Sequence, residues 1–199
     1  MARPRTVSDE KILQATIRMM AKHGPVAMTL AHVAGEIGLS PAALVKRFGS
    51  KRALLLEVSK TAGAGMAAAL AELRRTAASP LAALLDAATF LARHTRSAEE
   101  LANHLAFLQI DVTDPEFRRP MLALSRATLA GYRGLLDDAI ARKELRRCDT
   151  EQLARVLNAV VGGSLIAWAV FRKGSAEAWL RADLEAALEP HRLPRKSGT

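Results

Sequence analysis

Eight residues between positions 29 and 51 have side chains that could contact DNA. Hydroxyl and cationic side chains commonly bind phosphate oxygens, and small side chains let a helix backbone approach the edges of the bases. These residues are Thr29, Ser40, Pro41, Ala42, Ala43, Lys46, Arg47 and Lys51. Their types predict a nucleic-acid interface, provided that the chain places them on one surface.

The spacing of these residues predicts two short helices joined by a tight turn. Thr29 can cap the first helix, and Gly38 can end it in a left-handed conformation. Ser40 and Pro41 are a capping residue and a first-turn proline, which start a second helix running to about Phe48. The first helix has one apolar stripe, formed by Leu30, Val33, Ala34 and Ile37. An ordinary helical hairpin is the alternative interpretation.

Small and basic residues on the outside of the second helix are typical of a helix-turn-helix motif. In that motif the second helix enters the major groove with its first turn towards the bases. A preceding helix over residues 8–23 would complete a three-helix domain.

The positive charge of the chain is concentrated around this motif. The 199 residues carry a formal net charge of +9. Residues 1–60 contain ten Lys or Arg and four acidic residues, which accounts for +6 of that total. This is the charge distribution of a phosphate-binding module. No strongly basic amphipathic helix stands apart from the motif, so membrane binding is not expected.

At these residues the chain resembles the tetracycline-repressor (TetR) family of bacterial transcription regulators. The match covers about residues 8–58 and is carried by Thr29, residues 38–40, Phe48, Ser50 and Lys51. The resemblance implies that Thr29 and Lys51 contact phosphates. The family usually has tyrosine where this chain has Val45, whose side chain cannot bind phosphate. That contact is therefore lost, or replaced by one from Lys46.

The remainder of the chain predicts helices and almost no sheet. Half of the residues are apolar, Ala and Leu dominate, and both favour helices. We expect an all-α protein of about nine helices with three parts. These are a DNA-binding domain at residues 1–58, a helical regulatory domain for effector binding and dimerisation at 59–190, and a disordered tail at 191–199.

The segment 150–172 is apolar on nearly all sides, so it must be buried on more than one side. A second subunit could cover it, and two adjacent glycines would let two helix backbones approach. We therefore expect a homodimer, and the resemblance implies one formed by the last two long helices. A self-contained bundle with an internal central helix is the alternative. The predicted interface residues are Val160, Gly162, Gly163, Leu165, Trp179 and Leu184.

The resemblance also implies a small-molecule effector bound in the helical core. Large or polar residues beside aliphatic stripes predict where it binds, namely Phe107, Asp111, Arg126 and Trp168. Asp111 and Arg126 could anchor a charged or hydroxylated ligand. Each of the four also fits an ordinary core or surface position.

Catalytic and metal-binding motifs are missing from the sequence. It has no HExxH, no phosphate-cradling glycine loop and no GxSxG, and its five histidines lack ligand spacing. We expect no enzyme activity, no cofactor and no metal. Cys148 is the only cysteine, so an intrachain disulfide is excluded. Its basic neighbours could lower its pKa for oxidant sensing, and a bystander role is the alternative.

Membrane and export signals are also missing. The longest apolar run, 156–171, is shorter than the ~18 residues that a spanning helix needs. No signal peptide is visible. We expect a cytoplasmic bacterial protein associated with the nucleoid.

These expectations combine into two hypotheses of different classes. The first is a TetR-like regulator, most simply a repressor, that binds a palindromic double-stranded operator as a dimer and is released by an effector. The second is a helical small-molecule-binding or interaction protein whose DNA binding is weak or vestigial.

Overall fold

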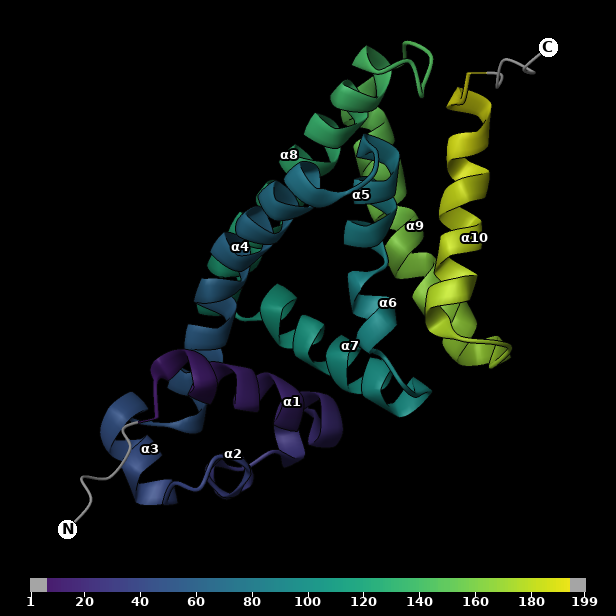
Figure 1. The fold of residues 1–199 in the computed structure, drawn as a ribbon. Coiled ribbons are helices and arrows are strands. Elements are labelled where there is room, and N and C mark those ends of the chain that lie inside the picture. Colours follow the sequence, from purple (N-terminus) through teal and green to yellow (C-terminus); the bar gives the residue numbers. More distant parts are fainter. Residues whose placement is uncertain (1–6, 194–199) are drawn as a thin grey trace. The chain divides into compact units, whose positions relative to one another are not determined.

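A computed structural model describes residues 7–193 and confirms the all-α class (Figure 1). Over these residues the chain forms ten α-helices and one short 3-10 helix, with no β-strand. The helices are α1 (Asp9–Ala27), α2 (Leu30–Glu36), α3 (Pro41–Phe48), α4 (Lys51–Thr76), α5 (Pro80–Ala88), α6 (Phe90–His94), α7 (Ala98–Thr113), α8 (Pro115–Ala141), α9 (Thr150–Phe171), α10 (Ala176–Leu188) and the 3-10 helix η1 (Glu189–His191). The count exceeds the nine expected because residues 80–95, whose pattern predicts one helix, are divided at Thr89 into α5 and α6.

The chain divides into two compact units, which are described separately. Unit 1 contains the residues up to Gly63 together with Glu99–Leu122, and unit 2 contains Ala64–Ala98 and the residues from Ala123 onward. Unit 1 therefore adds most of α7 and the start of α8 to the helices around the predicted motif.

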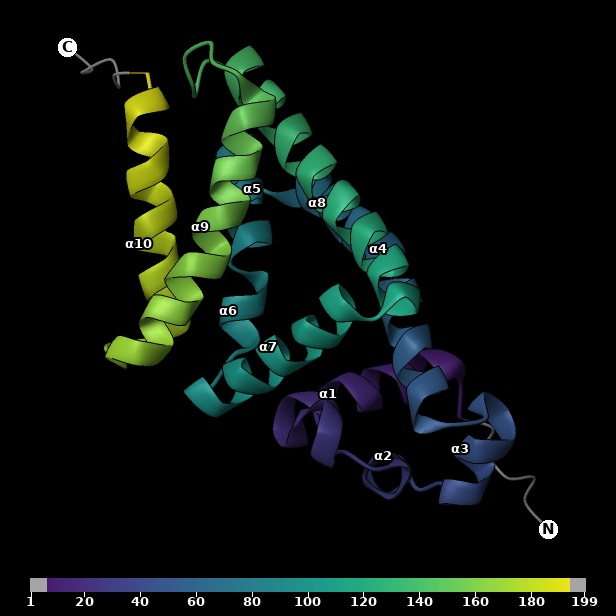
Figure 2. The ribbon, with the colours of Figure 1, turned by 180° about the vertical axis from the view of Figure 1, so that it is seen from behind.

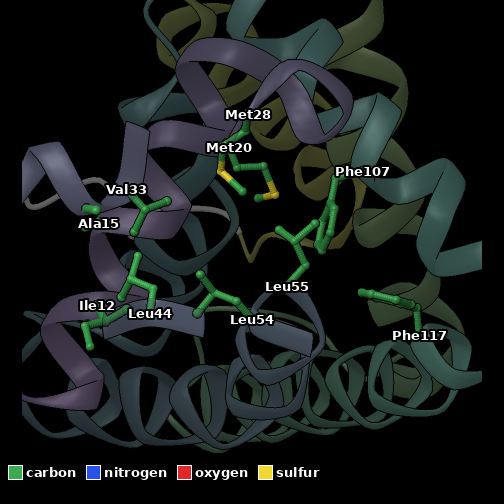
Figure 3. Close-up of a cluster of buried hydrophobic side chains, with 11 residues drawn as sticks. Ile12, Ala15, Met20, Met28, Val33, Leu44, Leu54, Leu55, Phe107 and Phe117 are labelled. Carbon is green, nitrogen blue, oxygen red and sulfur yellow. The ribbon is translucent and has the colours of Figure 1, made fainter. Parts of the chain in front are cut away.

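Unit 1 has one hydrophobic core, to which its sequence-distant segments all contribute. Figure 3 shows side chains of α1 to α4 pointing towards one another, with two phenylalanines from α7 and α8 beside them. Ile12, Leu44 and Leu54 are fully buried there. The rings of Phe107 and Phe117 meet edge to face with centroids 6.1 Å apart, a favoured aromatic geometry. This core ties residues 99–122 to the N-terminal helices.

Helix α1 extends beyond residue 23, where the sequence predicted that it would end. Gly24 has φ +74°, which breaks the regular helix, and one further turn follows from Pro25 to Ala27. Asn103 of α7 donates from Nδ2 to the carbonyl oxygen of Ala21 at 2.8 Å. A Cβ at position 24 would lie 2.6 Å from Asn103 Oδ1. Glycine is thus required both by the backbone conformation and by the approach of α7.

Unit 2 is built around the packing of α9 against α10, which lie side by side in Figures 1 and 2. Leucines of both helices are fully buried in this unit, such as Leu157 and Leu180. The second half of α4 runs beside the second half of α8. There Arg74 forms an ion pair with Asp138.

The C-terminal end of unit 2 differs from the tail expected at residues 191–199. The backbone N–H of Arg146 donates to the carbonyl oxygen of His191 at 2.8 Å, and that of Leu193 donates to Glu144 at 3.3 Å. The first three residues of the expected tail are therefore paired with the segment before α9. The rest of it, 194–199, lies outside the described residues.

Two of the described helices, α4 and α9, are long and apolar enough to cross a membrane, with mean hydropathy 1.2 and 1.6. The sequence estimate for α9 was too short because it counted only residues 156–171. A core helix of a soluble protein passes the same test, so length and composition do not separate the two classes.

Replacing Gly24 with alanine should destabilise the protein by about 1–3 kcal/mol, because alanine strains a positive φ and its Cβ would collide with Asn103. Urea unfolding measures this loss. Gly35→Ala is the control, since no atom lies within 4 Å of a Cβ there and alanine favours a helix. Equal stability of the two variants would contradict the packing described for Gly24.

Candidate nucleic-acid interface

The start of α2 is fixed by two reciprocal hydrogen bonds. Thr29 Oγ1 accepts from the backbone N–H of His32 at 3.2 Å, and His32 Nδ1 accepts from the backbone N–H of Thr29 at 3.3 Å. This is a capping box with histidine as the third helical residue. The ring of His23 stacks on that of His32, with centroids 4.3 Å apart. The predicted capping role of Thr29 is confirmed, and His32 is a partner that the sequence reasoning missed.

The turn and the start of α3 have the predicted geometry. Gly38 has φ +68°, the left-handed conformation expected at a helix end. Ser40 Oγ accepts from the backbone N–H of Ala43 at 3.2 Å, and Pro41 is the first residue of the helix. Gly49, with φ +85°, ends α3 and leads into α4. These local contacts make α2 and α3 a helix-turn-helix.

One face of α3 is held in the core and the other is exposed. Leu44 is fully buried and Phe48 is partly buried against the same core. The remaining residues of the helix are exposed, namely Pro41, Ala42, Ala43, Val45, Lys46 and Arg47. The structure therefore brings the small residues and Lys46 onto one outward surface.

Arg47 is engaged inside unit 1. Its guanidinium forms an ion pair with Asp9 at 2.5 Å and donates to the carbonyl oxygen of Val7 at 2.6 Å. It thereby ties the end of α3 to the start of α1. Lys46, by contrast, forms no ion pair or hydrogen bond with any residue in the described range 7–193.

Lys51 is also engaged, and its partners are carbonyl oxygens of the connection between α1 and α2. Its Nζ donates to Val26 and Met28 at 2.9 Å and to Pro25 at 3.1 Å. An ammonium group has three N–H donors, so all of them are used. Neutral carbonyls do not cancel its charge, which stays beside Thr29.

Arg52 attaches the start of α8 to α4 within unit 1. Its guanidinium pairs with Asp114 and with Glu116, each at 2.7 Å. It also lies over the ring of Phe117, 5.0 Å from the centroid, a cation–π geometry. The sequence reasoning missed this cluster, because no local pattern links positions 62 residues apart.

The four predicted ligand contacts are divided between the units. Phe107 and Asp111 belong to unit 1, whereas Arg126 and Trp168 belong to unit 2. Phe107 is part of the unit 1 core, and Trp168 Nε1 donates to the carbonyl oxygen of Gly174 at 3.1 Å. Arg126 is exposed. Two surface clefts of unit 2, beside Cys148 and beside Arg74, include neither Arg126 nor Trp168.

Asp111 is a buried carboxyl group on α7. Its Oδ1 accepts a hydrogen bond from Ser59 Oγ of α4 at 3.3 Å. Burial raises the pKa of Asp111 to about 6, although the bond from Ser59 acts in the opposite direction. A buried carboxyl prefers its neutral form because the charged form loses its hydration.

Cys148 does not have the environment that oxidant sensing requires. Burial raises the pKa of its thiol, and Asp149 and Asp137 act in the same direction. A reactive cysteine needs a lowered pKa, so the bystander role is favoured. Among the described residues, no group of three or more His, Cys, Asp or Glu could hold a metal ion.

The predicted dimer residues differ in exposure. Leu165 and Leu184 are 3% and 1% exposed, so both side chains face the core of their own subunit, in contrast to the prediction that they meet a partner. Gly162 and Gly163 are exposed, while Val160 and Trp179 are partly buried. The exposed apolar side chains of α9 are instead Val156, Ile166, Val170 and Phe171.

Residues 12–58 match the family model described as "Bacterial regulatory proteins, tetR family". The N-terminal domain belongs to the TetR family. The match covers α2, α3 and the turn between them, so the TetR-family domain of this chain is a helix-turn-helix DNA-binding domain. A comparison with curated protein sequences found no match.

Solved structures of TetR-type regulators share this fold over 92–94% of the chain. The TetR family regulator PfmR from Thermus thermophilus is 28% identical with a TM-score of 0.63, covering 92% of this chain and 99% of that one. A putative regulator from Saccharomonospora viridis in complex with choline is 23% identical, with a TM-score of 0.71 and coverage of 94% and 98%. Reduced E. coli NemR is 16% identical, with a TM-score of 0.73 and the same coverage.

Replacing Lys51 with methionine should lower the free energy of unfolding by about 1–2 kcal/mol, because three carbonyl oxygens lose their donor. Lys46→Met is the matched control, and it should change stability by less than about 0.5 kcal/mol, as exposed positions usually do. Urea unfolding of both variants measures this. If Lys51→Met weakens DNA binding without changing stability, Lys51 acts only as a phosphate ligand.

Asp111 should make the stability of the protein depend on pH. Its pKa is about 6 in the folded state and lies above the ordinary value of 3.8, so the folded state retains the proton longer than the unfolded state. Stability should therefore fall as the pH rises from about 4 to 6 and stay level above that.

Replacing Asp111 with asparagine should remove this slope and stabilise the protein at pH 7. The measurement is urea unfolding at several pH values, with exposed Asp183→Asn as the control. An unchanged slope in Asp111→Asn would show that other groups cause the pH dependence.

Proposed function

We propose that this protein is a dimeric transcriptional repressor that binds a near-palindromic operator through α3 and is released by a small-molecule effector. The observation that carries the proposal is the outward face of α3. It is presented by a helix whose other face is fixed in the core of a TetR-family domain.

We assign the DNA contacts by the exposure of each residue and by the hydrogen-bond donors that it has not already used. Thr29 and Lys46 are exposed and suit phosphates, while Ser40, Pro41, Ala42 and Ala43 lie at the start of α3, which faces the bases in this motif. Arg47 has further N–H donors beyond those that hold Asp9 and Val7. Lys51 would bind phosphate only by releasing a carbonyl oxygen.

Dimerisation is supported by the apolar surface that unit 2 leaves exposed. Val156, Gly163, Ile166 and Val170 recur at intervals of three, four and seven residues along one side of α9. Ile166 and Val170 are 49% and 74% exposed. On α10, Ala178, Ala182 and Ala186 are also exposed. Packing these stripes against those of a second copy would bury them in a four-helix bundle.

A two-fold dimer would place its two α3 helices in successive major grooves. The half-sites would then be one DNA turn apart, roughly 34–36 Å. A symmetric protein matches a near-palindromic operator, because each subunit reads the same half-site. A regulator that binds DNA in this way would work in the bacterial cytoplasm, beside the nucleoid.

An effector pocket is supported by Tyr132 of α8. Its side chain is 3% exposed, and its hydroxyl forms no hydrogen bond with the residues that the structure describes. That hydroxyl remains within reach of solvent, so a polar group of a ligand would bond to it in place of water. Of the contacts predicted from the sequence, Arg126 and Trp168 belong to the same unit as Tyr132, whereas Phe107 and Asp111 belong to unit 1, and all four stay predictions. The choline complex belongs to another protein of the same fold and supports only the general role of a small ligand.

A ligand releases DNA only if it prefers the conformation that does not bind DNA. Such a compound should raise the melting temperature of the free protein and weaken its DNA complex.

The second candidate is a helical small-molecule-binding protein with weak DNA association. It is motivated by Val45, which replaces a phosphate-binding tyrosine, and by the scarcity of hydrogen-bonding side chains on α3. It predicts no preferred DNA site, whereas the repressor proposal predicts one.

The decisive measurement is selection of bound sites from random DNA, followed by titration of the selected duplex at several salt concentrations. The proposal predicts a near-palindromic site bound by two chains. Lys46→Ala should weaken binding to all sequences and reduce the salt slope by about one unit per half-site, because each lost phosphate contact releases fewer counterions.

The control for this titration is Lys173→Ala, which removes an equal charge from an exposed position in unit 2. It should leave affinity and slope almost unchanged. If Lys46→Ala behaves like the control, the assignment of α3 as the DNA contact is wrong.

A further inference from the structure

We infer that α3 reads its operator mainly through the methyl groups of thymine, which contact Ala42, Ala43 and Val45, rather than through hydrogen bonds to base edges. This inference rests on the DNA-binding function proposed above. It adds the chemistry by which that surface distinguishes one sequence from another.

The hydrogen-bonding groups of α3 are nearly all committed to the fold. Ser40 Oγ accepts from the backbone of Ala43, which leaves only its hydroxyl proton as a free donor, and Pro41 has no N–H. Arg47 holds Asp9 and Val7 at the far end of the helix. The helix contains no Asn, Gln or Ser, and Asn and Gln are the usual readers of adenine. Arg47 keeps unused N–H donors, but its bonds to Asp9 and Val7 hold it at the C-terminal end of α3, away from the first turn that faces the bases in this motif.

The free surface of α3 consists of methyl groups beside one cation. Ala42, Ala43 and Val45 are exposed, with Val45 at 47%. Ala42, Val45 and Lys46 lie at intervals of three and four residues, so they share one side of the helix, and Ala43 borders it. Lys46 can neutralise a phosphate beside the groove while the alanines allow close approach.

Thymine is the base that matches such a surface. In the major groove it alone carries a C5-methyl group, and apolar side chains such as alanine recognise it by contact. Burying one methyl-sized group changes an affinity by a factor of about four. Several such contacts, repeated in both half-sites, would favour thymine at defined positions without any side-chain hydrogen bond.

The orientation of α3 makes these contacts specific to position. Leu44 is fully buried and sets the rotation of the helix about its axis. The ion pair of Arg47 with Asp9 fixes its C-terminal end. Each exposed methyl group therefore has a defined place relative to the groove.

The test replaces single thymines of the selected operator with uracil, which keeps every hydrogen-bonding group and lacks only the methyl. Uracil at the contacted positions should weaken binding about fourfold per half-site, and uracil outside the half-sites should have no effect. A 5-methylcytosine–guanine pair at a contacted position should bind more tightly than the same pair without the methyl group.

A coupling experiment assigns the contact to α3. Val45→Ala should abolish the effect of uracil at one position per half-site and leave the other uracil effects unchanged. Val112→Ala, at an exposed position on α7, is the matched control and should change none of them. Circular dichroism and thermal melting establish that both variants are folded.

Three outcomes separate the hypotheses. If no sequence is selected, the proposed DNA-binding function fails and this inference fails with it. If a site is selected but uracil has no effect at any position, the function stands and methyl readout is overturned in favour of hydrogen bonding or DNA shape. If uracil substitution changes DNA binding by Val45→Ala and Val112→Ala equally, Val45 does not contact a thymine methyl group.

Discussion

Burial of Leu44 in the core of unit 1 is the contact on which the proposed interface depends. This side chain packs among residues of α1, α2 and α4, including Ile12, Val33 and Leu54. A short helix has little stability of its own, so packing of its apolar face must hold it. Because Leu44 faces inward, Ala42, Ala43 and Lys46 necessarily face outward. The same contact therefore sets the stability of α3 and the identity of the surface offered to DNA.

The cations around the motif have different roles, which a count of charges does not distinguish. Arg47 is paired with Asp9, and Arg52 is paired with Asp114 and Glu116, so both contribute to holding unit 1 together. Lys51 organises carbonyl oxygens but keeps its net charge. Lys46 is exposed and without a partner among the described residues. The excess of positive charge thus attracts DNA as a whole, while only part of it is free to contact phosphate.

Segment 99–122 joins the DNA-binding helices through contacts that are distant in sequence. Asn103 caps the carbonyl of Ala21, and Asp111 accepts from Ser59. The chain passes from one unit to the other near residues 63, 98 and 122. The passage near residue 63 lies inside α4 and the one near residue 122 lies inside α8. A continuous helix is a rigid element, so these two covalent links are stiffer than a loop would be.

The sequence by itself determined the features whose physics is local. The cap at Thr29, the positive φ of Gly38, and the start of α3 at Ser40 and Pro41 each depend on a few neighbouring residues, and all were predicted. The concentration of charge and the all-α class also follow from composition. The TetR resemblance was visible for the same reason, since its motif lies within one short stretch.

Only the tertiary structure decided which groups face each other. A helix that is apolar on nearly all sides does not reveal its inner face, so Leu165 and Leu184 were predicted at the dimer interface although both are buried within their own subunit. The partners of Lys51 and Arg47, 23 to 40 residues away, likewise depend on how the helices pack. Packing is a property of the whole fold, and no local pattern encodes the meeting of two distant side chains.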